Sequence, residues 1–344
     1  MDTKPFETIM SQLATDPQLH TSHLFSLSRI DKEMLDIFTR VWPTIAPQRR
    51  RDIMQELMEI TEVNFEVDFN AIFLLGMVDE DARVRATSIK SLWEYEHPSL
   101  IKPLVHLLKT DDAPAVREAA ASTLGKFVYL RELEEIDPNE ANLAEEALLE
   151  TIYQAGEDLH VRRRALEAVS FSGDPRIAPI IESAYYSDEE KMQVSAIFAM
   201  GRNADVAWLP RIMAELDNPS NEIRFEACRA CGELEAREAV DALVQLIDED
   251  TDTEVQEMAI WALGRIGGET AREALEIIVD GDNESLAQAA EESLDELNLF
   301  SDAMMLYDFS EYDDAEEIFL EDLDFMDTDF TNGRNGQETE DYLN

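Results

Sequence analysis

Residues 222–232 read Glu-Ile-Arg-Phe-Glu-Ala-Cys-Arg-Ala-Cys-Gly, which is one copy of a pattern that recurs along the chain. With Ile223 as the anchor, the same place in the other copies is filled by an apolar residue, namely Val84, Val116, Val161, Met192, Val255 and Leu286. Successive anchors lie 32, 45, 31, 31, 32 and 31 residues apart. A nearly fixed period of this length indicates an array of structural repeats.

Each copy predicts a helix with one face of small side chains. The fourth and seventh residues after the anchor are Ala, Ser or Thr in every copy. Small residues at helical spacing allow a second helix to approach closely. Three residues before the anchor stand good N-cap residues: Asp81, Asp158, Ser220, Asp252 and Asn283. Nine residues after it stand glycines, which we interpret as left-handed C-terminal caps: Gly125, Gly201, Gly232 and Gly264.

The rest of each period carries a second apolar run, for example residues 210–216 and 242–247. Two helices in a period of about 31 residues are typical of a helical solenoid. The pattern Asp-x-x-x-Val-Arg-x-x-Ala-x-x-Ala-Leu-Gly, carried by residues 156–162 and 253–264, resembles the short HEAT-like repeat of bacterial proteins such as phycobilisome lyase subunits. The resemblance implies an all-α, right-handed α-solenoid of about seven to eight HEAT-like helix pairs. It is specific for the fold and weak for function.

Charge and composition narrow the classes of partner. The chain of 344 residues has 28 Lys and Arg against 76 Asp and Glu, a formal net charge of −48. Such a charge disfavours nucleic acid and anionic membranes, which need a positive field. It favours a basic protein partner or simply high solubility. We expect no membrane span, no signal peptide and a reducing, cytoplasmic setting, because apolar runs are short and there are only two cysteines.

The chain divides into three predicted parts. Residues 1–30 form a partly ordered N-terminal segment, residues 31–300 the solenoid, and residues 301–344 an acidic tail with interspersed aromatic residues. We expect the tail to be disordered and to dock on a partner or on the solenoid in cis, or else to act as a solubilising extension. The single interval of 45 residues predicts an insertion near residues 130–141. That insertion is either a functional loop or a longer helix end.

No residues predict a catalytic, metal or cofactor site. Cys228 and Cys231 have the spacing of a metal or redox pair, but both occupy apolar columns of the repeat, so we assign them to the core. None of the five histidines forms a paired motif. The His-Glu pairs of iron-binding HEAT-like hydroxylases are absent.

Two groups are candidates for binding. The concave positions of three consecutive repeats are apolar, which predicts either a stripe that anchors a protein partner or internal packing, at Val194, Phe198, Phe225, Met258 and Trp261. One repeat carries a basic cluster that either binds or neutralises nearby acidic residues, at Arg162, Arg163 and Arg164. Arginines directly after the anchor are expected to pair with acidic residues of the next repeat: Arg85, Arg117, Arg162 and Arg224.

The sequence therefore predicts a non-catalytic protein–protein interaction scaffold or assembly factor that binds a partner on the concave face. The resemblance to lyase subunits leaves one alternative, a bilin lyase or lyase-like accessory subunit.

Overall fold

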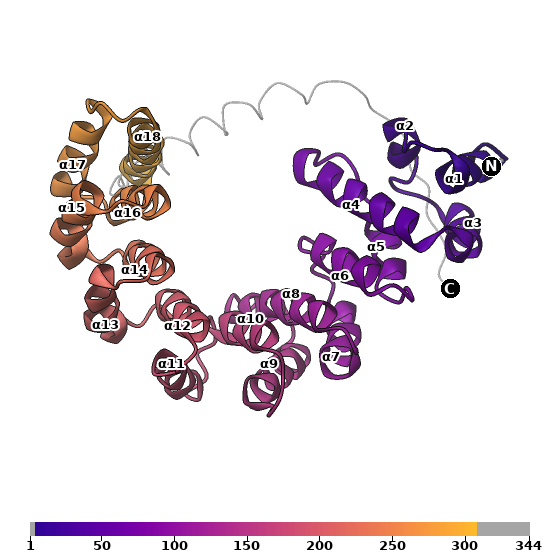
Figure 1. The fold of residues 1–344 in the computed structure, drawn as a ribbon, viewed down its shortest axis with the longest axis horizontal. Coiled ribbons are helices and arrows are strands. Elements are labelled where there is room, and N and C mark those ends of the chain that lie inside the picture. The colour runs from indigo at the N-terminus through magenta and orange to yellow at the C-terminus, as the bar shows by residue number, and fades with distance from the viewer. Residues whose placement is uncertain (1–3, 308–344) are drawn as a thin grey trace, which may run out of the picture.

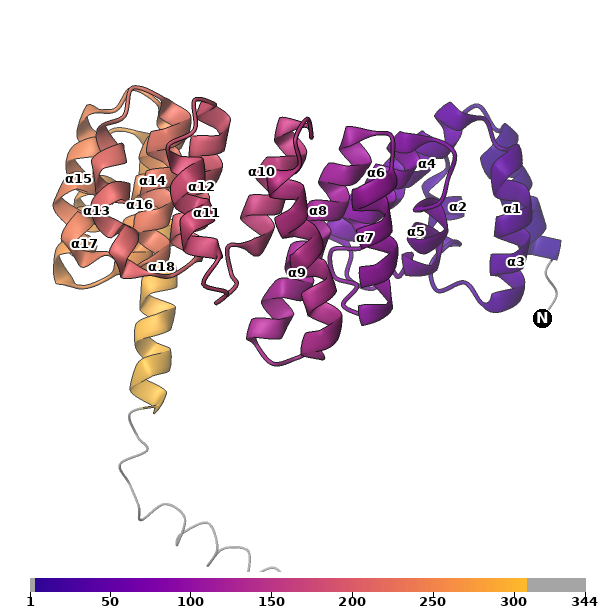
Figure 2. The same cartoon turned by 90° about the horizontal axis from the view of Figure 1, so that it is seen from below.

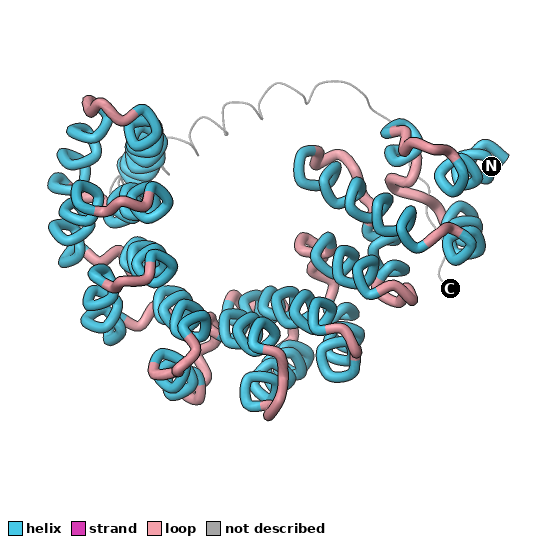
Figure 3. Tube along the Cα trace, viewed as in Figure 1, coloured by secondary structure: helices cyan, strands magenta, loops and turns pink. Residues whose placement is uncertain are grey.

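The computed structural model describes residues 4–307, with side chains up to residue 299. Within these residues helices make up the regular structure and no strand occurs (Figure 3). The all-α prediction is confirmed, because each apolar run of the repeat has the helical period and few residues interrupt it.

Sixteen of the helices form eight consecutive pairs along an arc, and in seven of them, all but α3 and α4, the two helices pack directly against each other (Figure 1). The inner helices line the concave side: α4 (Pro47–Val63), α6 (Ala82–Ser91), α8 (Pro114–Glu132), α10 (Leu159–Val169), α12 (Glu190–Arg202), α14 (Asn221–Glu233), α16 (Thr253–Ile266) and α18 (Glu284–Tyr307). Their partners precede them in the chain: α3 (Lys32–Val41), α5 (Asn70–Gly76), α7 (Ile101–Thr110), α9 (Pro138–Tyr153), α11 (Ile177–Tyr185), α13 (Leu209–Ala214), α15 (Val240–Glu249) and α17 (Glu269–Val279). The molecule is an α-solenoid.

The predicted N-caps hold four of the inner helices. The side chains of Asp81, Asp158 and Asp252 accept hydrogen bonds from backbone N–H groups of the first helical turn. Asn283 does the same for α18. The prediction is wrong for Ser220, whose hydroxyl instead donates to Glu190 at 2.9 Å, so it joins two neighbouring inner helices.

The interpretation of the four recurrent glycines as left-handed caps is wrong. All four lie inside inner helices, and none has a positive φ. Their role is close packing: a Cβ atom on Gly201 would lie 2.9 Å from the Cα atom of Ala230 on the next inner helix. The left-handed backbone comes three residues later, at Ala204, Glu235 and Gly267.

The core lies between the two layers and contains the small columns of the repeat. Ala227, Cys228 and Cys231 on α14 have no exposed surface. The assignment of both cysteines to the core is therefore confirmed, and it follows from their place in the apolar columns.

The remaining sequence forms the two ends of the solenoid and the longer connection between two of its repeats. Residues 4–30 include α1 (Lys4–Thr15) and α2 (Thr21–Phe25). Phe6 and Met10 of α1 are buried. The 45-residue interval contains the two long helices α8 and α9, joined by residues 133–137. Helix α18 continues to Tyr307, and in Figure 2 its last turns project beyond the edge of the solenoid. The rest of the predicted tail, residues 308–344, lies outside the described residues.

Contacts between neighbouring outer helices are uneven along the arc. Outer helices α7 and α9 pack together, whereas α5 and α7, α9 and α11, and α11 and α13 do not pack in this way, and the inner helices join the repeats there. Figure 2 shows the separation at α10 and α12, near the middle of the arc. Four helix pairs lie on each side of this α10–α12 junction.

Candidate functional site

The arginines after the anchor join successive repeats, as predicted, in three copies. Arg85 pairs with Asp111 at 2.8 Å, Arg117 with Glu157 at 2.6 Å and Arg224 with Asp250 at 2.6 Å. The fourth differs, because the Arg162 guanidinium donates to the backbone carbonyl of Ile152 at 3.0 Å. The three ion pairs are largely buried and join the first turn of an inner helix to the loop before the next inner helix, so they belong to the structure of the stack.

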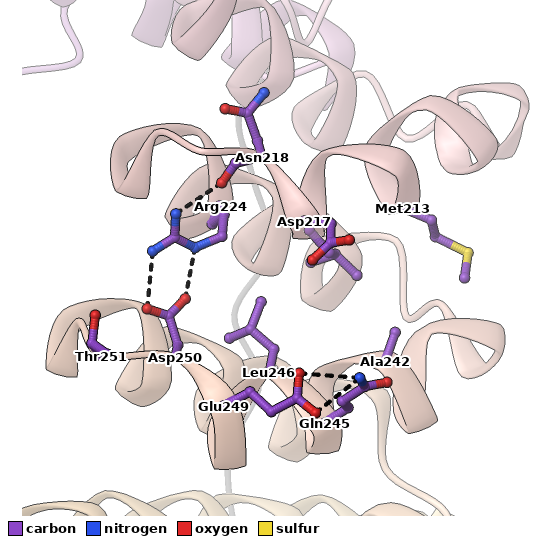
Figure 4. A pocket seen from close by; sticks show the side chains of 11 residues that line it. Met213, Asp217, Asn218, Arg224, Ala242, Gln245, Leu246, Glu249, Asp250 and Thr251 are labelled. Carbon is purple, nitrogen blue, oxygen red and sulfur yellow. Dashed lines mark hydrogen bonds and ion pairs between the residues drawn. The ribbon is translucent and has the colours of Figure 1, made fainter.

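Arg224 and Asp250 also line a pocket of about 500 Å³ between η4 (Glu215–Asp217) and α15 (Figure 4). The Arg224 guanidinium donates hydrogen bonds to both carboxylate oxygens of Asp250 and to the backbone carbonyl oxygen of Asn218. The hydrogen bond from Arg224 holds the pKa of the Asp250 carboxyl below its usual range. Because these charged groups are already paired with each other, the pocket offers little to a ligand.

The structure does not bring the predicted basic cluster together on one surface. Arg163 is buried and donates to the Ser195 hydroxyl at 2.8 Å. Arg164 contacts Glu167 and lies 3.4 Å from Glu118 on α8. With Arg162 engaged at Ile152, Arg164 alone extends to the concave surface, where its side chain is 39% exposed.

The five apolar residues predicted as a stripe lie in separate settings. Val194 is buried and shares a pocket of about 250 Å³ with Phe225. Met258 and Trp261 are half-buried and pack against the core, Trp261 beside Gly232. Phe198 belongs to a different group.

That group is a line of aromatic rings and guanidinium groups across the concave face, which we call the aromatic–arginine row. It consists of Tyr129 on α8, Phe171 after α10, Phe198 and Arg202 on α12, and Arg229 on α14. The Tyr129 and Phe171 ring centres lie 4.9 Å apart. The Arg202 guanidinium lies 5.3 Å from the Phe171 ring and 5.6 Å from the Phe198 ring, and Arg229 lies 4.1 Å from Phe198 on α12. Rings and cations at these distances attract each other, so the row is ordered before any ligand binds.

The row presents cations outward and holds its acidic groups inside. The side chains of Arg164 and Arg202 are 39% and 40% exposed, whereas those of their partners Glu167 and Glu233 are 11% and 15% exposed. Arg229 is fixed between Glu226 and Glu233. Burial raises the pKa of the Glu226 carboxyl, against the opposing effect of Arg229. Although the chain has a net charge of −48, the most exposed charged groups of these ion pairs are the guanidinium groups of Arg164 and Arg202.

Two buried polar atoms at the α14 end of the row lack a hydrogen-bond partner among the described residues: Nη2 of Arg229 and Oε2 of its ion-pair partner Glu233. A pocket of about 330 Å³ lies along the rest of the row, lined by Tyr129, Phe171 and Phe198 together with Lys126 and Arg164. The Lys126 ammonium is already committed, since it donates to the backbone carbonyls of Leu92, Trp93 and Tyr95. The pocket thus combines aromatic walls with the exposed guanidinium of Arg164.

Sequence reasoning found Phe198 and Arg164 but missed Tyr129, Phe171, Arg202 and Arg229. Phe171, Arg202 and Glu233 stand ten residues after their anchors, one position beyond the glycine column. Comparing this tenth position across the repeats would have drawn attention to Phe171 and Arg202. Tyr129 lies in the irregular 45-residue interval, where the repeat gives no register.

The described residues show neither a metal-binding group nor a membrane-crossing helix. No cluster of three or more His, Cys, Asp or Glu side chains is placed to hold a metal ion there. Equally, none of the helices in that part of the chain is both long and apolar enough to traverse a bilayer.

Comparison with known proteins identifies the repeat. A family model of HEAT repeats matches residues 70–150 and 209–295. No curated protein matches the sequence. The described fold is similar to the CpcE–CpcF complex of phycocyanin lyase from Nostoc sp. PCC7120, with 19% identity, 65% of this chain and 86% of that chain covered, and a TM-score of 0.46.

Two further solved structures show a similar arrangement of helices. Importin beta is 15% identical, with 86% of this chain and 46% of that chain covered and a TM-score of 0.47. Human deoxyhypusine hydroxylase is 16% identical, with 86% and 96% covered and a TM-score of 0.34. These likenesses concern helix arrangement and do not bear on activity. The matched family and the paired helices together show that the chain is an α-solenoid that carries HEAT repeats.

Proposed function

We propose that the protein is a non-catalytic interaction scaffold or assembly factor, and that its protein partner binds the concave face at the aromatic–arginine row. The observation that supports this is the row itself, which places rings and guanidinium groups of four successive inner helices side by side. Tyr129 is 42% exposed and Arg202 is 40% exposed, so both are accessible from the interior of the arc. Tyrosine and arginine are over-represented among the residues that dominate binding energy at protein interfaces.

The chemistry of the partner follows from the charge distribution. At the row the partner presents carboxylates and apolar or aromatic side chains, because exposed arginines and ring faces are what it meets. Away from the row the solenoid is strongly acidic, and basic residues of the same partner are favoured there. Nucleic acid and anionic membranes are disfavoured as ligands by the same net charge, and the proposed setting is the cytoplasm, with no cofactor.

A pair of matched double variants tests the proposal. Tyr129→Ser with Arg202→Glu removes an exposed ring and reverses a guanidinium that is both ion-paired and stacked on rings. Tyr186→Ser with Arg211→Glu does the same on the outer layer, where Tyr186 is 67% exposed and Arg211 pairs with Glu182 and stacks on Trp208.

Full-length wild type and both variants are immobilised and exposed to native lysate, after their unfolding midpoints have been compared. We expect some lysate proteins to bind the wild type and the outer-layer variant equally. The same proteins should not bind the concave variant. Retention of the same proteins by all three forms would contradict binding at the row.

A further inference from the structure

The described chain ends on the same edge of the solenoid as the aromatic–arginine row. Neighbouring inner helices run in the same sense with a progressive twist along the arc (Figure 1), and the row lies in the last turns of α8, α12 and α14 and just after α10. Helix α18 is also an inner helix, and its C-terminal turns project from that edge (Figure 2). The described chain therefore leaves the solenoid on the edge where the row lies.

The sequence that follows has the composition that suits the row. Residues 308–344 contain 14 Asp and Glu and a single basic residue, Arg334. Between residues 313 and 330 the acidic residues alternate with apolar and aromatic ones, among them Phe319, Phe325 and Phe330. Carboxylates pair with the exposed guanidinium groups of Arg164 and Arg202, and rings pack against Tyr129 and Phe171.

The length of this segment is sufficient to reach the row. Inner helices in contact lie about 8–10 Å apart, so α12 is about 30 Å from α18, three helices away. An extended chain spans about 3.3 Å per residue, so about ten residues cover that distance. The 37 residues after Tyr307 leave ample length to lie along the row.

We infer that residues 313–330 occupy the aromatic–arginine row of the same molecule and compete there with the protein partner. The inference rests on the proposed function of the row as a binding site and adds its regulation. Carboxylates of the segment meet the exposed guanidinium groups of Arg164 and Arg202, and its phenylalanines lie against the pocket between Tyr129 and Phe198. Attachment to the solenoid gives the segment a local concentration of about a millimolar, so even a weak contact is occupied.

Photo-cross-linking of the full-length chain tests this occupancy. Thr328→Cys is labelled with benzophenone maleimide, and labelling is selective because Cys228 and Cys231 are both fully buried. After illumination, the covalent products are separated by mass and the attached peptides are mapped. We expect cross-links within single chains to the last turns of α8 and α12 and to the residues just after α10.

Two pairs of substitutions control for the charge change. Arg164→Glu with Arg202→Glu alters the row, and Arg176→Glu with Arg211→Glu alters similarly exposed, ion-paired arginines of the outer layer. The first pair should lower the cross-link yield at the row by about threefold to tenfold, as expected for the loss of two exposed ion pairs and their replacement by repulsion. The second should leave it unchanged. Phe319→Ser with Phe325→Ser, which alters no described residue, should lower the yield as the first pair does.

The inference would be overturned by equal cross-link yields in both arginine pairs or by cross-links on the outer helices. Cross-links found only in covalent dimers would also overturn it, because they would place the segment on a second copy of the chain. The result is separable from the test of function. Cross-links at the row without a row-dependent partner would support occupancy of the row by residues 313–330, but would contradict both the competition and the proposed function. A row-dependent partner without these cross-links would support the proposed function and contradict the occupancy.

Discussion

At the scale of single residues, the recurrent glycines determine how closely the inner helices approach. Gly201→Ala should destabilise the protein by about 1–3 kcal/mol, the usual cost of an extra methyl group in a well-packed core. Its Cβ atom would lie 2.9 Å from the backbone of Ala230, which cannot rotate away. Urea unfolding measures the change. Gly173→Ala is the matched control, because its Cβ atom would meet nothing nearer than 3.6 Å. Similar losses in both variants would show that close approach is not the cause.

The two cysteines give a second prediction at this scale. Burial raises the pKa of the Cys231 thiol to about 12 and raises that of Cys228 further. Only the thiolate reacts readily, so neither thiol should be modified by a chromogenic disulfide reagent at pH 8 in the folded chain. Both should react once the protein is unfolded in guanidinium chloride. Rapid modification of either thiol without denaturant would show that α14 is accessible or opens locally.

At the scale of elements, the ion pair of Arg224 and Asp250 joins the start of α14 to the loop before α16. The hydrogen bond from Arg224 lowers the pKa of the Asp250 carboxyl in the folded protein, relative to about 3.9 in the unfolded chain. The stabilisation is therefore present above about pH 4 and is lost as the pH falls through the lower, folded value.

Asp250→Asn should then lower the free energy of unfolding at pH 7 by about 1–3 kcal/mol, because Arg224 loses its charged partner. The difference between the wild type and the variant should shrink below about pH 4. Chemical unfolding at a series of pH values measures it. Asp248→Asn, at an exposed position in the last turn of α15, is the control and should change little. A difference that persists undiminished at pH 2.5 would rule out the carboxylate as its source.

The elements also show what the sequence can and cannot predict. Helix pairs, four N-caps and three of the joining ion pairs follow from short-range patterns, because spacing and capping chemistry are local. The role of Gly201 and its counterparts could not be predicted from the sequence. A glycine near a helix end is equally compatible with a C-terminal cap and with close packing of a neighbouring helix. The aromatic–arginine row combines side chains from α8, α12 and α14 with Phe171 after α10. One of these side chains, Tyr129, lies where the period is interrupted. Contacts of that kind are fixed by the curvature of the stack, which a single repeat does not contain.

At the scale of the whole molecule, charge opposes the compact arrangement. Acidic residues outnumber basic ones by 76 to 28, so most carboxylates have no cation to pair with. Screening of their repulsion should raise the thermal midpoint when NaCl increases from about 10 mM, where the Debye length is about 30 Å, to about 300 mM, where it is below 8 Å. Differential scanning fluorimetry in a series of salt concentrations checks this. A midpoint that falls over the same range would mean that weakening of the ion pairs outweighs the relief of repulsion.

The α10–α12 junction gives the binding face a mechanical consequence. Tyr129 and Phe171 belong to the four pairs on one side of it, and Phe198, Arg202 and Arg229 to the four pairs on the other. A ligand on the row would contact both arms of the arc, which are joined at this junction through the inner helices α10 and α12. Because each arm is several helix pairs long, a small rotation at the junction would displace the far ends by a larger distance. We therefore expect the opening between α1 and α18 to change in width when the row is occupied.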